Sequence, residues 1–233
     1  MTGTVYLVGA GPGAPDLLTL RAARLLERAD IVFFDALVHP DTLALAERAV
    51  RVAVGKRCGR HATAQRFINK RLIAAAARYT TVVRLKGGDP MLFARAQEEI
   101  AALTAAGIAY EVVPGITAAL AASAELGIPL TWRGLSRSVA FLTPRAGADE
   151  SPANAWLRGA LAADTVVLYM ASHEAARIAA ALIANGKAPA TPVAIVENAS
   201  LPEARRWLST LAQLRDVPPL EFSGPATLLV GEV

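Results

Sequence analysis

The sequence predicts an α/β fold made of two α/β domains, and three observations support this. Short runs of β-branched and other apolar residues alternate along the chain with Ala- and Leu-rich stretches of helical character. Such alternation is typical of parallel sheets with right-handed crossover helices. The apolar runs are nearly continuous, as expected for strands that are covered on both faces. The pattern then starts again after a Gly- and Pro-rich passage at Gly127–Gly134.

In the first half, strands and helices are expected to follow one another in turn. The expected strands are Val5–Val8, Ile31–Phe34, Val52–Val54, Thr81–Leu85 and Tyr110–Val113, and the expected helices are Pro15–Arg28, Pro40–Arg48, Ala64–Arg78 and Ala94–Ala106. A helix of very small residues, Ala118–Ala124, is expected after the last of these strands.

In the second half, the strands lie closer together and helices are fewer, which favours a mixed sheet. The expected strands are Ser138–Thr143, Thr165–Met170, Pro192–Glu197, Arg206–Leu211 and Ala226–Val230, with helices at Pro152–Ala162 and Glu174–Ala184. The domain boundary is expected between Pro114 and Gly134. We place it so that the two domains are residues 1–117 and 118–233.

Composition narrows the class of protein. The chain has 233 residues, of which 54% are hydrophobic and 19% charged, which favours a large core and argues against disorder. No segment is long and apolar enough to span a bilayer, and the N-terminus lacks the pattern of a secretory signal. Cys58 is the only cysteine, which favours a reducing cytoplasm. The net charge of +4 permits an acidic ligand or nucleic acid without choosing between them.

The first expected strand runs directly into a glycine-rich turn, Gly9-Ala10-Gly11-Pro12-Gly13. Its spacing differs from the dinucleotide-binding fingerprint, which needs a glycine where Ala14 stands. Pro12 and Pro15 also lack the backbone N–H groups that hold a pyrophosphate. The turn therefore favours a nucleoside without phosphate, such as S-adenosylmethionine, and is equally compatible with an ordinary tight turn.

Two further glycine-bearing turns follow expected strands. They are Lys86-Gly87-Gly88-Asp89-Pro90 and Pro114-Gly115-Ile116-Thr117-Ala118. Asp89 can accept hydrogen bonds from ribose hydroxyls or cap the next helix, and Thr117 can cap the helix that it precedes. Because open α/β sheets bind ligands at the carboxyl ends of their strands, we expect the three turns to meet at one edge.

Charged residues also follow the strands. Asp35 comes directly after strand Ile31–Phe34, where its carboxylate can take a proton or cap a turn. The loop Gly55-Lys56-Arg57-Cys58-Gly59-Arg60-His61 carries three cations and a histidine, which suits a clamp for several carboxylates or a solvated surface loop. His61 has no partner at metal-ligand spacing, so no metal is assigned.

These motifs together resemble the uroporphyrinogen-III C-methyltransferases of the tetrapyrrole methylase superfamily. The similarity covers essentially the whole chain, in order. Its blocks are Gly9–Gly13, Val54–His61 with Gln65 and Ile68-Asn69, Arg84–Pro90, Pro114–Ala118, Gly127–Thr131 and Pro192–Glu197. The Val-Gly-Lys-Arg-x-Gly-x-His-x-x-x-Gln block is particularly similar to this branch.

The resemblance implies two α/β domains with a cofactor cleft between them, in a cytoplasmic homodimer. It implies two successive methyl transfers from S-adenosyl-L-methionine to uroporphyrinogen III, giving S-adenosyl-L-homocysteine and precorrin-2 for sirohaem, cobalamin or haem d1. Neither nucleic acid nor membrane is an expected partner.

The resemblance also implies site residues. Cofactor contacts are expected from Pro12, Gly87, Gly88, Asp89, Leu92, Thr117, Ala118, Met170, Ala199 and Ala226. Asp35 and Lys56 fall at the positions of the proton acceptor and donor. Arg95 and Glu98 lie in the segment that faces substrate, and Arg95 is expected to clamp a carboxylate or stabilise charge, because guanidinium stays protonated. Further substrate contacts are expected from Arg57, Arg60, His61 and Arg133.

The chain departs from the family pattern on the substrate side. Ala94-Arg95-Ala96-Gln97 stands where the family has Gly-Arg-Gly-Gly, and any of these positions that needs positive φ would be strained. Trp132 replaces a common His, Pro144-Arg145 replaces Gly-His, and Ala171 follows Met170 where Gly is usual. We therefore expect the cofactor side to be intact and the substrate side to be altered.

Three other functions remain open at this point. The first is a methylase of the same superfamily that acts on a later precorrin. The second is a relative that methylates RNA or protein, which the lack of aromatic residues among the basic ones disfavours. The third is a non-catalytic tetrapyrrole-binding protein, which the altered Ala94–Gln97 stretch keeps open.

Overall fold

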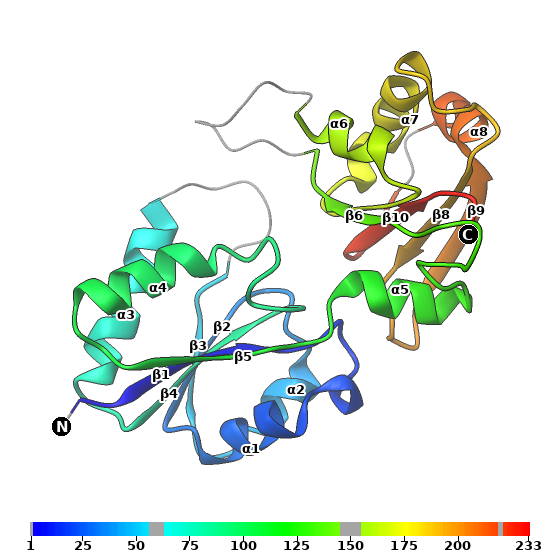
Figure 1. Ribbon diagram of the computed structural model, residues 1–233. Coiled ribbons are helices and arrows are strands. Elements are labelled where there is room, and N and C mark those ends of the chain that lie inside the picture. The colour runs from blue at the N-terminus through cyan, green and yellow to red at the C-terminus, as the bar shows by residue number, and fades with distance from the viewer. Residues whose placement is uncertain (1, 56–62, 145–154, 219–220) are drawn as a thin grey trace. The chain divides into compact units, whose positions relative to one another are not determined.

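The computed structural model describes residues 2–55, 63–144, 155–218 and 221–233 (Figure 1). The chain divides into two compact units, Met1–Thr117 and Ala118–Val233. Each unit is an α/β structure with its own five-stranded sheet, which confirms the predicted fold class. In the described parts of the chain, no helix combines the length and apolar character needed to cross a bilayer.

Unit 1 is an open parallel sheet with the strand order β3-β2-β4-β1-β5. Its strands are β1 (Thr4–Gly9), β2 (Ile31–Phe34), β3 (Val50–Ala53), β4 (Thr81–Lys86) and β5 (Tyr110–Val113), and its helices are η1 (Pro15–Leu17), α1 (Leu20–Arg28), α2 (Pro40–Ala44), α3 (Thr63–Ala76) and α4 (Ala96–Ala105). The carboxyl ends of β1, β4 and β5 therefore lie side by side, as the turns predicted.

Helices cover both faces of this sheet (Figure 1). On one face, Leu72 of α3 and Leu103 of α4 pack with Leu7 of β1 in a buried cluster. On the other face, Leu25 of α1 packs with the next residue of β1, Val8. Because side chains alternate across a strand, neighbouring residues of β1 enter different cores, which explains the continuous apolar runs.

Unit 2 has a mixed sheet, as predicted, and its strand order is β6-β7-β10-β8-β9. Its strands are β6 (Val139–Leu142), β7 (Thr165–Leu168), β8 (Pro192–Glu197), β9 (Arg205–Thr210) and β10 (Ala226–Val230), and its helices are α5 (Ala118–Leu126), α6 (Ala155–Ala162), η2 (Ser172–Glu174), α7 (Ala175–Ala184) and α8 (Leu211–Asp216). β6 and β7 are parallel, whereas β10 is antiparallel to β7 and β8. Helix α5 packs on one face, and α6, α7 and α8 pack on the other (Figure 1).

Several predicted boundaries were wrong for identifiable reasons. The expected helix Pro15–Arg28 is interrupted, because Thr19 is extended and its side chain caps α1 by accepting from the Ala22 N–H. The helix expected at Ala94 begins at Ala96, because Arg95 is left-handed with φ of 56°. The helix expected at Pro40–Arg48 ends at Ala44.

Helix α8 was not predicted, and the strand expected at Arg206–Leu211 ends one residue earlier, at Thr210. Thr210 and Gln213 form a capping box, in which each side chain bonds the backbone of the other residue. The Thr-x-x-Gln pattern was therefore the available signal for this helix. For the helix expected at Pro152–Ala162, the part before Ala155 lies outside the described residues.

Candidate active site

The three glycine-bearing turns of unit 1 meet at one edge of the sheet, as predicted. The N–H of Gly11 donates to the carbonyl oxygen of Gly88 at 3.2 Å, and the N–H of Gly88 donates to that of Gly11 at 2.7 Å. A Cβ atom on Gly9 would lie 2.6 Å from the Cα of Gly115, closer than real Cβ atoms come. We call this edge, formed by Gly9–Gly13, Gly87–Pro90 and Pro114–Thr117, the glycine edge.

Most of these glycines allow two segments of the protein backbone, and not a ligand, to approach each other closely. Gly9 and Gly115 leave room for each other, and a Cβ on Gly87 would lie 2.7 Å from the Cβ of Leu37. Gly88 differs, because its φ of 68° requires glycine while a Cβ there would meet only the Cα of Thr117, at 4.0 Å, among the described residues. Among the described residues, Gly88 therefore borders open space, whereas Gly9, Gly87 and Gly115 are packed against other parts of the protein.

Asp89 connects the second turn to the third. Its Oδ1 accepts from the N–H of Met91 at 2.8 Å, and its Oδ2 accepts from the N–H of Gly115 at 2.9 Å. The sequence left capping of the next helix and ribose binding open. Asp89 does not cap α4, whose N-cap residue is Arg95, but bonds the backbone of two turns instead. A carboxylate oxygen has a second lone pair, so Asp89 keeps acceptor capacity for a ligand.

The other predicted cofactor contacts of unit 1 lie on the same turns. Pro12 is half-buried between Gly11 and Gly13, and the N–H of Leu92 donates to the carbonyl oxygen of Asp89 at 3.3 Å. Thr117 ends unit 1 and its Cα lies beside Gly88. The predicted cofactor contacts of unit 1 therefore lie on the glycine edge or, for Leu92, directly after its second turn.

Asp35 lies at this edge as predicted, directly after β2. Its Oδ1 accepts from the N–H of Leu37 at 3.1 Å, and a Cβ on Gly87 would lie 3.7 Å from that oxygen. Its Oδ2 is 3.9 Å from a terminal guanidinium nitrogen of Arg84, and its side chain is 23% exposed. Asp35 is thus a held carboxylate that remains accessible to solvent, as a proton acceptor must be.

Beneath the edge lies a buried charge cluster that the sequence analysis missed. Glu99 of α4 is fully buried and accepts from Arg84 Nε at 3.0 Å, from Lys86 Nζ at 2.8 Å and from Gln65 Nε2 at 3.1 Å. Burial is the main cause that lowers the pKa of Lys86, the charge of Arg84 adds to it, and Glu99 opposes both. The available signal was Arg84 inside a strand expected to be buried, with Lys86 directly after it, because buried charges need partners.

Arg95 and Glu98 form an ion pair before and within α4. Arg95 Nε and Nη2 donate to the two oxygens of Glu98 at 2.6 and 2.8 Å, and both side chains are 48% exposed. The hydrogen bond to Glu98 is the main cause that raises the pKa of Arg95. A base role for Arg95 is therefore excluded, in agreement with the sequence analysis.

The replaced family glycines do not lie at strained positions. Positive φ in this segment occurs at Phe93 (52°) and Arg95 (56°), and not at Ala94, Ala96 or Gln97. The strain considered for the three substituted positions is therefore absent.

In unit 2, the predicted cofactor contacts also gather at one sheet edge. Met170 follows β7 and Ala199 follows β8, while Ala226 begins the antiparallel β10 and pairs with Glu197. The phenolic oxygen of Tyr169 accepts from the N–H of Ala119 at 3.1 Å, which holds the start of α5, and with it Ala118, at the same edge. The Met170 edge is defined here by Met170, Asn198–Ser200, Ala226 and the start of α5.

The backbone of the Met170 edge is unusual. Met170 (φ 55°), Asn198 (51°) and Ser200 (77°) are non-glycine residues in the left-handed region. Such residues cost free energy and are concentrated at functional sites. The Met170 edge is therefore a second candidate region, independent of the glycine edge.

Glu197 supports the Met170 edge from within. Its side chain is fully buried, and its Oε1 accepts from the N–H groups of Ser223 and Gly224 at 2.5 and 2.7 Å. Burial alone would raise its pKa, but the hydrogen bonds from Gly224, Arg205 and Ser223 outweigh burial and lower the pKa. Glu197 therefore fixes the segment that leads into β10.

Not every predicted residue can be placed. Lys56, Arg57, Arg60 and His61 lie outside the described residues. Arg133 is exposed, in a turn in which the N–H of Ser136 donates to the carbonyl oxygen of Trp132 at 2.8 Å. Among the described residues, no group of three or more His, Cys, Asp or Glu side chains is placed to hold a metal ion.

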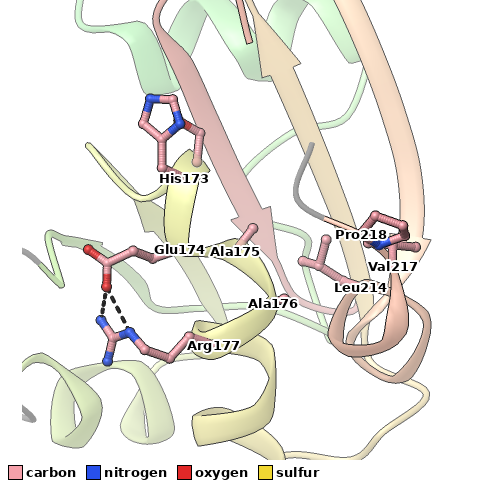
Figure 2. A pocket seen from close by; sticks show the side chains of 9 residues that line it. His173, Glu174, Ala175, Ala176, Arg177, Leu214, Val217 and Pro218 are labelled. Carbon is pink, nitrogen blue, oxygen red and sulfur yellow. Dashed lines mark hydrogen bonds and ion pairs between the residues drawn. The ribbon is translucent and has the colours of Figure 1, made fainter. Parts of the chain in front are cut away.

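A hollow of about 320 Å³ lies elsewhere in unit 2, between the start of α7 and the end of α8 (Figure 2). Leu214, Val217 and Pro218 line one side, and Glu174 and Arg177 on α7 pair with each other (Figure 2). None of the predicted site residues within the described ranges lines this hollow, and its acid and base neutralise one another. We therefore assign the chemistry to the sheet edges.

Comparisons with known proteins identify the family of the chain. Residues 4–215 match the family model of the tetrapyrrole (corrin/porphyrin) methylases. The chain is 47% identical over 234 residues to the uroporphyrinogen-III C-methyltransferase of Pseudomonas aeruginosa, covering 100% of this chain and 95% of that protein. It is 48% identical over 235 residues to a siroheme synthase of Psychrobacter sp., covering 99% of this chain but only 48% of that enzyme.

The chain thus spans about half the length of the siroheme synthases that it matches. Among solved structures, the uroporphyrin-III C-methyl transferase of Thermus thermophilus complexed with S-adenyl homocysteine is 40% identical, with a TM-score of 0.84 and coverage of 99% of this chain and 98% of that one. Over nearly its whole length, the chain therefore belongs to the tetrapyrrole (corrin/porphyrin) methylase family.

Proposed function

We propose that this protein is an S-adenosylmethionine-dependent C-methyltransferase that methylates uroporphyrinogen III twice to give precorrin-2. The observation that carries the proposal is the convergence of three glycine-bearing turns and Asp35 at one sheet edge. The nearly full-length match to a uroporphyrinogen-III C-methyltransferase supports the substrate. The siroheme synthases that it matches suggest that the product serves sirohaem synthesis.

The glycine edge suits a nucleoside cofactor without phosphates. Gly88 borders open space, and Asp89 keeps acceptor capacity for ribose hydroxyls beside it. Pro12 and Pro15 withhold the N–H groups that a pyrophosphate would need. We propose that S-adenosylmethionine contacts the residues that the family resemblance assigns to it, at the glycine edge and at the Met170 edge.

The residues around Asp35 suit the acid–base part of the reaction. When bound, S-adenosylmethionine supplies a methyl group to a ring carbon, leaving S-adenosylhomocysteine and a methylated substrate that must lose one proton. We propose that the Asp35 carboxylate receives that proton and passes it to solvent through its exposed side. The N–H of Leu37 holds one oxygen of Asp35, so the carboxylate is oriented before the reaction.

The substrate carries a rim of carboxylates, which cationic residues can bind. Arg95 is half-exposed and in a fixed orientation beside the glycine edge, since Glu98 holds its guanidinium. Together with Lys56, Arg57, Arg60, His61 and Arg133, it forms the proposed set of substrate contacts. The exposed apolar side chains of Leu37, Met91 and Phe93 offer surface for the faces of the macrocycle.

The altered Ala94–Gln97 stretch keeps a non-catalytic tetrapyrrole-binding protein as an alternative, which the assay below tests. The substituted positions have ordinary φ, so backbone strain does not argue for that alternative. A methylase for a later precorrin is the other alternative to test. A cytoplasmic homodimer stays part of the proposal, as the family resemblance implies.

The test is an anaerobic assay with labelled S-adenosylmethionine and uroporphyrinogen III, followed by mass spectrometry of the product. With the wild type we expect two added methyl groups, and with Asp35→Asn a kcat that is roughly 100-fold lower but still measurable. The surface variant Arg21→Met should behave as wild type. Methylation of a precorrin but not of uroporphyrinogen III would select the other methylase. Binding of labelled cofactor without transfer to either would refute the proposed activity.

A further inference from the structure

Arg84 lies between two carboxylates that belong to different parts of unit 1. Its Nε donates to Glu99 Oε1 at 3.0 Å, and its Nη2 lies 3.9 Å from Asp35 Oδ2. Its Nη1 donates to the carbonyl oxygen of Leu85 at 2.9 Å. Only 4% of Arg84 is exposed, so its contacts with Glu99 and Leu85 are shielded from water, while the contact with Asp35 lies towards the solvent.

Glu99 fixes the position of Arg84. Because Glu99 is fully buried and accepts from Arg84, Lys86 and Gln65, its carboxylate has little freedom to rotate. Gln65 also donates to Asn69 Oδ1 at 3.0 Å, which ties the cluster to a second point on α3. The guanidinium is therefore held from α3, α4 and β4 at once.

The formal charges of the cluster balance only if Asp35 is counted. Arg84 and Lys86 contribute two positive charges, and Glu99 contributes one negative charge beside them. Asp35 is the second carboxylate in contact with this group of described residues. A buried group with an unbalanced charge is costly, so the contact between Arg84 and Asp35 is part of the charge balance of the cluster.

We propose that Arg84 is a positioning residue for the methyl transfer reaction, which orients the Asp35 carboxylate at the end of β2 while Glu99, Lys86 and Gln65 hold Arg84 in place. This inference rests on the proposed function and deepens it. Arg84 does not itself contact the substrate in this scheme. Arg84 affects turnover only by orienting Asp35. If it merely attached α4 to the sheet through Glu99, its effect on turnover would not depend on Asp35.

The test is a double-mutant cycle between Arg84→Lys and Asp35→Asn, with kcat and KM for uroporphyrinogen III and the calorimetric Kd for S-adenosylmethionine. Lysine keeps the charge but loses the fork that spans both carboxylates. We expect Arg84→Lys to lower kcat roughly 10- to 100-fold, as misplacement of a reacting group does. The Kd for the cofactor should stay within about twofold, since additive errors are of that size.

In the Asp35→Asn background, Arg84→Lys should change kcat by less than about twofold, because no carboxylate remains to be oriented. The same factor in both backgrounds, or an unchanged kcat in Arg84→Lys, would overturn the inference. The surface variant Arg21→Met serves as the control, since its partner Glu111 lies in an exposed ion pair.

Two further measurements keep the outcomes separate. If Arg84→Lys fails to fold, Gln65→Leu replaces it in the cycle, because this variant removes one hydrogen bond to Glu99 without changing any charge. We expect a smaller loss of kcat than in Arg84→Lys. This loss should again be absent in the Asp35→Asn background. If the wild type transfers no methyl group, the proposed function fails. If it transfers methyl groups and the two substitutions act independently, only the positioning role of Arg84 fails.

Discussion

Unit 1 turns its chain at the glycine edge with Gly11 and Gly88 at positive φ, whereas unit 2 uses Met170, Asn198 and Ser200 for the equivalent conformation. The supporting acids differ as well. Glu99 neutralises two buried cations, while Glu197 binds backbone N–H groups and the half-exposed Arg205. The comparison shows two ways of holding a sheet edge. Close backbone contact between glycines holds the glycine edge, whereas the buried carboxylate of Glu197 holds the Met170 edge.

We expect the largest effect on stability from removing the charge of Glu99, the buried acid of unit 1. Glu99→Gln removes the buried carboxylate that pairs with Arg84 and Lys86 and leaves only the partly exposed Asp35 near them among the described residues, so we expect the free energy of unfolding to fall by about 3–5 kcal/mol. A urea titration would measure it. Glu111→Gln, which removes the exposed partner of Arg21, is the control, with an expected loss of about 0–1 kcal/mol. Equal losses in the two variants would contradict the assigned burial.

The next effect tests the close packing of glycines. Gly115→Ala places a Cβ 2.8 Å from the Cα of Gly9, so we expect overpacking to lower the free energy of unfolding by about 1–3 kcal/mol. We also expect the affinity for the cofactor to fall. Gly127→Ala is the control for packing: no atom among the described residues lies within 4 Å of the added Cβ, and any cost comes from its φ of 67°, a conformation that Gly115 does not share. It should cost about 1 kcal/mol and leave affinity unchanged. Thermal unfolding and calorimetry would separate the two.

In unit 2, Glu197→Gln should cost less than the corresponding change at Glu99. The amide keeps one acceptor oxygen for the N–H groups of Ser223 and Gly224, and the guanidinium of Arg205 can still reach water. We expect a loss of about 1–3 kcal/mol. If denaturant titrations ranked Glu197→Gln above Glu99→Gln, the contrast between the two acids would be wrong.

The same residue predicts a pH dependence. Hydrogen bonds lower the pKa of Glu197 in the folded protein despite its burial. Its stabilising contribution is therefore complete above the pKa of the unfolded chain and is lost as the pH falls through the folded pKa. The stability difference between wild type and Glu197→Gln should shrink on acidification, which melting curves at several pH values would show. If the stability difference instead grew towards acid pH, the pKa of Glu197 would be raised in the folded protein and the prediction would be wrong.

The smallest expected effect concerns backbone strain at Met170. Met170→Gly removes a left-handed non-glycine residue, so stability should change by no more than about 1 kcal/mol, in the favourable direction. Cofactor affinity should nevertheless fall, because the proposed contact is lost. Unchanged affinity in calorimetry would remove Met170 from the proposed site.

Sequence reasoning succeeded where local pattern and topology agree. Parallel strands place their carboxyl ends together, so the meeting of Gly11, Gly88 and Gly115 followed from strand order alone. It failed for Glu99, because nothing in the spacing of α4 shows which helical carboxylate will reach Arg84. The left-handed conformation of Met170 was also invisible, since only the surrounding structure imposes it on a residue that does not prefer it.

Asp89 has a consequence for how the glycine edge responds to a ligand. Its carboxylate bonds the backbone of its own turn through Met91 and that of the next turn through Gly115, so neither turn can shift without breaking a bond to a charged acceptor. The edge is in this sense preorganised. A molecule that settles there meets two loops whose entropy was already given up during folding, and more of its contact energy remains available as affinity.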